Sequence, residues 1–294
     1  EKVIEILAVT PDASWLAAGE GNSSIHMIPL KEGGVRYKLT AHTDRVNSLN
    51  FSSDGNFLYS ASLDGRVLKW DLNARTCTNV TPAGTSITTV DVSSDGQYFA
   101  GINSQNRVVV WNPENSQAYF MVETERKNIN VIRFKPDDKI LAIGDNEGFV
   151  ELWDVNSGER ISAVMAHSDQ VNDIRFSKIA GQMATAGNDG SVRIFNVRNT
   201  ADLLEPPVII TDNEGFVVTV QFSPDGQSIL SGTSNGKNNL VSRPTHSDYM
   251  VKDICSLVTR NMTQDEWNIF VGRDIPWEPT CPENNFKIRI REVK

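Results

Sequence analysis

The sequence has few of the residues from which metal centres are built. Its four histidines, at positions 26, 42, 167 and 246, are scattered without the spacing of zinc ligands. The segment Asp-Asn-Glu-Gly occurs at 145–148 and 212–215, but neither copy has the alternating carboxylates of a calcium loop. A phosphate-binding glycine loop is also lacking. We therefore predict that the chain holds no metal and no cofactor.

Cysteine is sparse as well. The three cysteines, Cys77, Cys255 and Cys281, do not form the regular, even-numbered pattern of a disulfide framework. Reduced thiols and a cytoplasmic location are the favoured interpretation. Cys255 and Cys281 both lie near the C-terminal end, so a bridge between them stays open as the alternative.

Long apolar runs and an excess of positive charge are also lacking. No stretch approaches the roughly 18 apolar residues that cross a bilayer, and no secretory signal is visible. The formal net charge is −9 and the pI is about 5.0, so the surface repels the phosphates of nucleic acids and anionic lipids. We predict neither nucleic acid nor membrane as a partner. Because the sequence starts at Glu1 rather than at Met, we expect a longer protein with a further domain upstream.

The sequence does contain a repeat of about 42 residues. Successive marks of this repeat lie 41 to 46 residues apart, and each is an aromatic or bulky apolar residue that closes a short strand. These residues are Ile28, Trp70, Trp111, Trp153, Phe195 and Val241. A self-similarity of this length is typical of β-propellers.

Each unit of the repeat has the pattern of four short strands. In residues 41–81, alternating apolar segments are separated by Asp54-Gly55 and Asp64-Gly65, and Asp-Gly is a strong hairpin signal. The same pattern gives six units, at about 3–40, 41–81, 82–124, 125–165, 166–211 and 212–246. We predict an all-β fold, a propeller over 1–246, followed by a separate tail over 247–294. Four-stranded sheets stacked radially bury faces that one sheet alone leaves open.

The units resemble WD repeats. In that family a buried hydrogen-bond chain of His, Ser or Thr, Asp and Trp holds each blade, and the resemblance assigns this structural network to His42, Ser62, Asp64 and Trp70. The unit at 166 keeps His167 and Asp189 but has Gly187 and Phe195 at the other two positions. The remaining units lack the histidine. A Ser-His-Asp hydrolase triad is the alternative, but the Gly-x-Ser-x-Gly motif of such enzymes is lacking.

The resemblance also bears on ring size. The family most often closes with seven blades, so we expect the six visible units to be part of a seven-bladed ring, with a six-bladed ring as the alternative.

The tail has a different pattern. Residues 250–259 and a segment opening at Thr263-Gln-Asp-Glu266 are expected to be helical, the second with a capping box, and 286–293 alternates like a strand. We expect Trp267 and Phe270 to pack against the propeller. The tail resembles the end of bacterial multidomain WD-repeat proteins that carry an N-terminal caspase-like or signalling-NTPase effector. This implies a sensor or scaffold whose partner is an upstream effector domain of the same polypeptide.

One face of the propeller is the candidate binding surface. Strand starts and the loops between second and third strands gather there, and their residues are rich in neutral amides. The set is Arg45, Asn47, Leu63, Asn128, Asn130, Asn146, Gln170, Asn172, Asn188, Phe216 and Ser234. Amides and large anchors suit recognition of a protein or peptide. We predict a non-catalytic interaction module; a propeller hydrolase for a glycan or ester and a passive structural cap are the alternatives.

Overall fold

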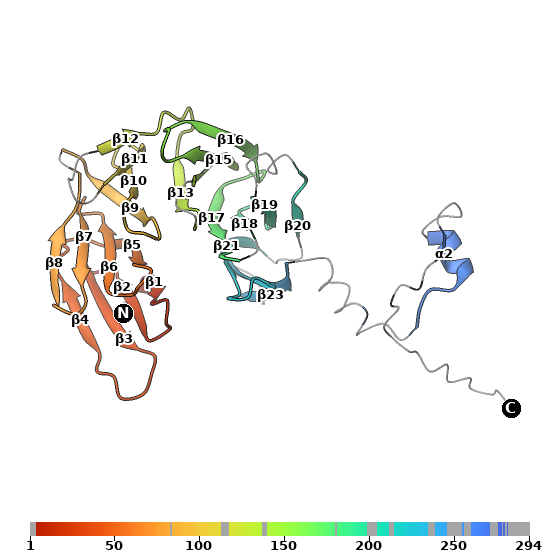
Figure 1. Ribbon diagram of the computed structural model, residues 1–294, viewed down its shortest axis with the longest axis horizontal. Helices are drawn as coiled ribbons and strands as arrows, with labels where there is room; N and C mark the ends of the chain where they lie inside the picture. Colours follow the sequence, from red (N-terminus) through yellow and green to blue (C-terminus); the bar gives the residue numbers. More distant parts are fainter. Residues whose placement is uncertain are drawn as a thin grey trace.

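Six antiparallel sheets and one short helix make up the described part of the chain. The computed structural model describes residues 4–82, 84–112, 118–136, 140–179, 181–198, 205–211, 215–234, 239–245, 255, 260–270, 276–277, 279 and 281. Figure 1 shows the six sheets following one another around an arc in sequence order. The predicted all-β propeller fold is confirmed.

Within each sheet, every strand pairs with the next strand along the chain. The first sheet comprises β1 (Ile4–Val9), β2 (Trp15–Glu20), β3 (Ser24–Pro29) and β4 (Tyr37–Thr40). The second comprises β5 (Val46–Phe51), β6 (Phe57–Ser62), β7 (Val67–Asp71) and β8 (Thr76–Asn79). The third comprises β9 (Ile87–Val92), β10 (Phe99–Asn103), β11 (Val108–Trp111) and β12 (Ala118–Met121).

The other three sheets repeat this order. The fourth comprises β13 (Ile129–Phe134), β14 (Ile140–Asp145), β15 (Phe149–Asp154) and β16 (Arg160–Met165). The fifth comprises β17 (Val171–Phe176), β18 (Gln182–Gly187), β19 (Val192–Asn196) and β20 (Val208–Ile210). The sixth comprises β21 (Phe216–Phe222), β22 (Ser228–Ser234) and β23 (Leu240–Pro244), three strands among the described residues.

The Asp-Gly turns have a steric reason. Gly65 has a φ of +81° in the turn between β6 and β7, a conformation that a side chain strains. A Cβ atom at this position would lie 2.2 Å from the Ser86 hydroxyl of the next sheet. Glycine here lets the turn close and lets the neighbouring sheet approach.

The core lies between the sheets. Five clusters of buried apolar side chains each join one sheet to the next. The repeat marks Trp70, Trp111, Trp153 and Phe195 each pack in the cluster shared with the preceding sheet. The 42-residue period is therefore the period of the inter-sheet contacts.

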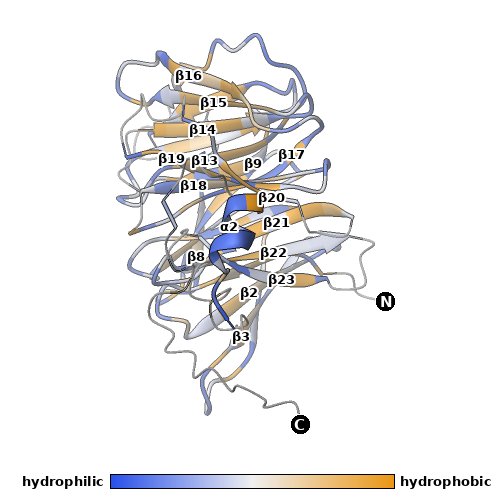
Figure 2. Cartoon of the chain, turned by 90° about the vertical axis from the view of Figure 1, so that its right-hand side faces the viewer, coloured by the Kyte–Doolittle hydropathy of each residue, from blue (hydrophilic) through white to orange (hydrophobic). Residues whose placement is uncertain are grey.

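The two ends of the arc leave apolar side chains exposed. Ile4, Leu7 and Val9 of the first sheet are exposed, as are Phe216 and Leu240 of the sixth. Figure 2, which faces the last sheets, shows the apolar colouring of β21. Among the described residues no apolar cluster joins the first sheet to the sixth. The described residues thus form six blades, and closure of a seven-bladed ring stays a prediction.

The tail contains the helix α2 (Gln264–Phe270). The capping box is confirmed, because the Thr263 amide donates to the Glu266 carboxylate at 2.9 Å and the Glu266 amide donates to the Thr263 hydroxyl at 3.2 Å. Figure 1 shows α2 apart from the sheets, so the expected packing of Trp267 on the propeller is not observed. The Phe270 side chain, the strand expected over 286–293 and all of 250–259 except residue 255 lie outside the described residues.

The tail cysteines are paired. Cys255 and Cys281 form a disulfide with their Cα atoms 5.5 Å apart, while Cys77 is free and exposed. The preference for reduced thiols is therefore wrong for two of the three cysteines. The Cys281 amide also donates to the Asn261 side chain at 2.7 Å, so the bridge and this bond hold the described tail residues around α2.

No helix among the described residues is long and apolar enough to cross a membrane.

Candidate functional site

The first predicted site is the buried network of the second sheet. The His42 imidazole bonds through Nδ1 to Asp64 at 2.9 Å and through Nε2 to the Ser60 hydroxyl at 2.7 Å. The Trp70 indole donates to the same hydroxyl at 2.8 Å. The serine of the network is therefore Ser60, not Ser62. The two serines point to the same side of β6 and differ in their place along the strand. Ser60 pairs with Leu68, two residues from Trp70, whereas Ser62 lies at the turn.

Ser62 has a different task. Its hydroxyl accepts the Asp64 amide at 3.1 Å and donates to the Asp44 carbonyl at 2.9 Å, which closes the turn. Ser60 is fully buried, so its hydroxyl has no access to a substrate in solvent. The geometry is that of a structural chain of hydrogen bonds, not of a hydrolase triad.

The fifth sheet carries a second copy of this network. His167 Nδ1 lies 2.9 Å from Asp189, and Nε2 lies 2.8 Å from the hydroxyl of Thr185. Thr185 thus supplies the hydroxyl. It lies two residues before Gly187, the position that the sequence pattern assigned to the hydroxyl, just as Ser60 lies two residues before Ser62. A side chain at Gly187 would meet the imidazole, because a Cβ there would lie 2.4 Å from His167 Nδ1.

The fourth sheet has no histidine and uses an acid that the sequence pattern did not reveal. Glu151 is fully buried, and its carboxylate accepts the Trp153 indole at 3.0 Å and the Thr124 hydroxyl at 2.8 Å. Arg126 and Arg160 donate to its other oxygen at 3.3 and 3.1 Å. The signal that could have revealed this network is an acid between the apolar residues Val150 and Leu152 of β15.

The predicted binding face is assembled by one recurring backbone hydrogen bond. In four sheets the loop after the second strand donates an amide to the carbonyl just before the first strand. The pairs are Leu63 to Arg45 at 2.9 Å, Ser104 to Ser86 at 3.0 Å, Asn146 to Asn128 at 3.1 Å and Asn188 to Gln170 at 2.9 Å. In the sixth sheet Phe216 and Ser234 are register partners. In the second, fourth, fifth and sixth sheets, two predicted face positions thus lie side by side.

The side chains of this face fall into two groups. Arg45, Leu63, Asn128, Asn146 and Phe216 are exposed. Asn47, Asn130, Gln170, Asn172, Asn188 and Ser234 are half-buried. The first group is available to a partner.

Several amides of the second group are already used inside the protein. Asn172 donates to the Asn188 side chain and to the Val217 carbonyl of the next sheet, both at 2.8 Å. Asn130 donates to the Val171 carbonyl at 3.4 Å in the same way. These amides tie adjacent sheets together, a role that the composition of the face did not reveal.

Arg45 is held in place without being buried. Its Nε donates to the Asn47 side chain at 3.2 Å, and its guanidinium lies 3.7 Å from the Glu5 carboxylate of the first sheet. An exposed pair of this kind contributes little to stability, so Arg45 is free to exchange it for a partner's acid.

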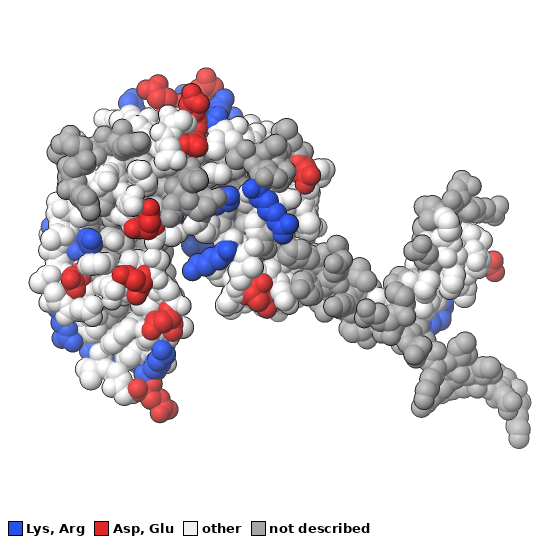
Figure 3. All heavy atoms as spheres, viewed as in Figure 1, with Lys and Arg blue, Asp and Glu red and all other residues white. Residues whose placement is uncertain are grey.

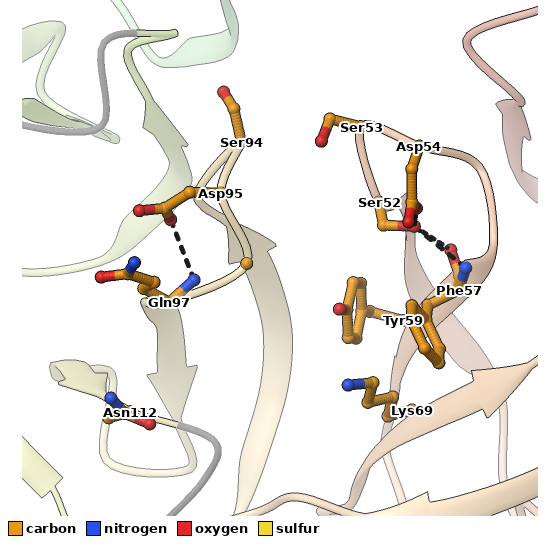
Figure 4. A pocket seen from close by; sticks show the side chains of 11 residues that line it. Ser52, Ser53, Asp54, Phe57, Tyr59, Lys69, Ser94, Asp95, Gln97 and Asn112 are labelled. Carbon is orange, nitrogen blue, oxygen red and sulfur yellow. Dashed lines mark hydrogen bonds between the residues drawn. The ribbon is translucent and has the colours of Figure 1, made fainter.

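The opposite face carries a polar pocket between the second and third sheets. It has a volume of about 600 Å³ and is bounded by the turns around Asp54 and Asp95, as Figure 4 shows. The Asp54 carboxylate accepts the Ser52 hydroxyl at 2.6 Å and the Asn56 amide at 3.0 Å, and these bonds lower its pKa. Both acids serve their own turns: Asp95 accepts the Ser93 hydroxyl at 2.7 Å and the Gln97 amide at 2.9 Å.

Metal-ligating side chains do not gather anywhere in the described ranges: no group of three or more His, Cys, Asp or Glu lies together there. Asp145 of the first Asp-Asn-Glu-Gly segment accepts the backbone amides of Glu147 and Phe149, both at 2.9 Å. This segment is a turn.

The two histidine networks make stability depend on pH. Burial lowers the pKa of His42 and of His167. Burial alone would raise the pKa of Asp189, but donors from Ser191 and His167 outweigh it and bring the pKa to about 2. Between the lowered histidine pKa and the ordinary value of about 6.5, the unfolded chain binds more protons than the folded one. Acidification therefore removes stability, first through the histidines and then, below about pH 4, through the aspartates.

We expect the free energy of unfolding to fall between about pH 7.5 and about pH 5.5. The variant H42Q/H167Q is expected to be less stable at the upper pH and to show a shallower fall. Urea unfolding followed by tryptophan fluorescence at several pH values measures both. An unchanged pH dependence in the variant would assign the effect to other groups.

The amides of the face allow a second test. Asn172→Ala removes two internal hydrogen bonds and is expected to lower the free energy of unfolding by about 1–2 kcal/mol. Asn47→Ala removes only the bond from exposed Arg45, so a change within about 0.5 kcal/mol is expected. Denaturant unfolding of the two variants compares them directly. Equal losses would contradict the division of the face into linking and available amides.

Comparison with known proteins fits this architecture. The family model described as "WD domain, G-beta repeat" matches residues 33–71 and 205–241, and that described as "Anaphase-promoting complex subunit 4 WD40 domain" matches residues 98–179. Similar proteins include "Periodic tryptophan protein 2" of Arabidopsis thaliana, 29% identical over 47% of this chain and 16% of the relative. "U3 small nucleolar RNA-associated protein 18 homolog" of Homo sapiens is 28% identical over 50% and 28%.

A third relative is shorter. "Target of rapamycin complex subunit wat1" of Schizosaccharomyces pombe is 25% identical over 48% of this chain and 46% of its own length. The matched segments thus span less than half of each of these three relatives. The stretches matched by the family models include at least one strand of each sheet and leave β1–β3, β8, β9, β18 and β19 unmatched. They include the complete His-Ser-Asp-Trp network of the second sheet. On this ground the chain is a WD-repeat β-propeller.

Proposed function

We propose that this propeller is a non-catalytic interaction module that binds a protein or peptide on the face made by the strand starts and the loops after the second strands. The observation that carries the proposal is the recurring backbone bond, which sets exposed Leu63 beside exposed Arg45 and repeats that arrangement around the arc. An arginine and large apolar groups amid neutral amides are the composition of a binding hot spot.

The relatives support the proposal at the level of assembly. One is named as a subunit of the target of rapamycin complex, and another as a protein associated with a small nucleolar RNA. By analogy with the target of rapamycin complex subunit, we propose that this chain is also part of a larger complex. We propose that a protein surface, not nucleic acid or membrane, is the direct contact, since the net charge of −9 disfavours phosphate backbones.

The finer proposal is that the chain is the sensing part of a longer bacterial signalling or defence protein, with an upstream effector domain as a further partner and the cytoplasm as its location. It rests on the resemblance of the tail, including RNMTQDEW at 260–267, to the segment that ends such proteins. The Cys255–Cys281 bridge is unusual for a cytoplasmic protein and argues against this location.

The face is tested by comparing the parent chain with the variant R45A/L63A/F216A in affinity capture from a native lysate. A specific partner is expected to bind the parent and to be lost from the variant, because the variant removes the three anchors. With the partner purified, calorimetry is expected to give a Kd at least about tenfold weaker for the variant.

The control variant carries three changes in the polar pocket of the opposite face, S53A/Q97A/K69A. It is expected to capture the partner as the parent does. Loss of binding in the control but not in the face variant would place the interaction on the other side of the propeller.

A further inference from the structure

The centre of the arc holds a cavity of about 770 Å³. The first strands of all six sheets contribute to its wall, among them β1, β13, β17 and β21. Its half-buried amides Asn47, Asn130 and Asn172 belong to the predicted face, so the cavity runs inward from that face. A hollow of this size accommodates several side chains of an extended peptide.

The charge of this cavity is opposite to that of the chain. The residues that line it include Arg133, Arg175 and Lys178 and no aspartate or glutamate. Figure 3 shows blue Lys and Arg side chains on one side of the hollow at the centre of the arc, and red Asp and Glu side chains on the other. In a chain with a net charge of −9, this local excess of positive charge needs an explanation. A cleft lined by one sign of charge focuses the field on a ligand of the other sign.

Strand register explains how the two arginines come together. The same position of the innermost strand recurs from one sheet to the next. In the register of the strands, Arg133 is paired with Ala142 and Arg175 with Ala184, the same position in adjacent repeats. The period of the repeat therefore sets the two guanidiniums side by side.

The acids near these arginines pair with them only in part. Asp173 lies 3.2 Å from Arg175 Nε and 3.6 Å from Arg133 Nη2, and it also accepts the Thr219 hydroxyl at 2.7 Å. Arg133 Nε is buried and has no hydrogen-bond partner in the described part of the chain. Burial and the neighbouring Arg175 lower the pKa of Arg133, as expected for two like charges held together.

A second acid, Asp91, also acts on Arg133, and its charge counters the lowering of the Arg133 pKa. Asp91 is buried, its carboxylate accepts the Phe134 amide at 2.7 Å, and burial raises its pKa. Lys178 is exposed at the end of the cavity where β17 terminates. The side chain of Arg175 is 34% exposed and that of Arg133 20%, so both reach the cavity.

We propose that this cavity binds an oxyanion carried by the partner, the carboxylate or phosphate group of an acidic peptide segment. Arg175 and Lys178 contact the anion, and Arg133 supports them from behind with its unpartnered Nε. This proposal rests on the proposed function and adds that the partner carries negative charge where it enters the cavity. Because guanidinium groups bind both carboxylates and phosphates through paired donors, the two sources share one chemistry.

The test is fluorescence anisotropy with two labelled peptides of about eight residues, an oligoglutamate and a serine peptide phosphorylated at alternate positions; an oligoglutamine of equal length is the neutral control. The protein is the whole chain 1–294, as the parent and as R175Q/K178Q. Arg133 is left unchanged because it is largely buried. The matched control K38Q/R107Q removes the same two charges from exposed sites outside the cavity.

The expected result is binding of at least one acidic peptide, weakened about tenfold or more by R175Q/K178Q and less than about twofold by K38Q/R107Q. The affinity is also expected to fall between about 50 and about 500 mM salt, because the contact is ionic. Whichever peptide binds more tightly identifies the source of the oxyanion.

Binding of neither acidic peptide, or equal weakening by both double variants, would overturn the proposal. So would binding of a single-stranded RNA of about ten nucleotides in place of the peptides. If the partner captured through Arg45, Leu63 and Phe216 binds R175Q/K178Q as tightly as the parent, the oxyanion site fails while the interaction face stands.

Discussion

A four-stranded sheet with two apolar faces cannot bury both of them alone, and this constraint shapes the whole molecule. Each of the five apolar clusters belongs to two sheets, so no blade has a core of its own. Stability is then a sum of contacts between neighbours, as in other repeat architectures. The same constraint leaves Leu7 and Leu240 exposed at the two ends of the arc, where a neighbour is missing among the described residues.

The hydrogen-bond networks are less uniform than the packing. Ser60 and Thr185 serve His42 and His167 in the second and fifth sheets, whereas buried Glu151 takes the tryptophan indole of the fourth. All three solutions satisfy a polar group that burial would otherwise leave unpaired. A degenerate sequence motif is therefore compatible with the same blade, because the requirement is a partner for each buried group and not one particular residue.

The fold was predictable because its signals are local and repeated: Asp-Gly turns, alternating strands and a period of about 42 residues. The error of two positions between Ser62 and Ser60 arose because both serines point to the same side of β6, and only the distance along the strand to Trp70 distinguishes them. The use of Asn172 as a tie between sheets and the pairing of Cys255 with Cys281 depend on contacts between distant residues. Such contacts leave no trace in a local pattern.

The chemistry of the centre follows from the same geometry. One recurring position of the innermost strands lies near the centre of the arc, and in five of the six sheets its residue lines the central cavity. Here that position carries Ala8, Asn50, Asp91, Arg133, Arg175 and Gln221 in turn around the arc. The apolar clusters recur from sheet to sheet, while this position changes in nearly every one. The shared apolar clusters thus set the shape, and this variable position sets the charge at the centre.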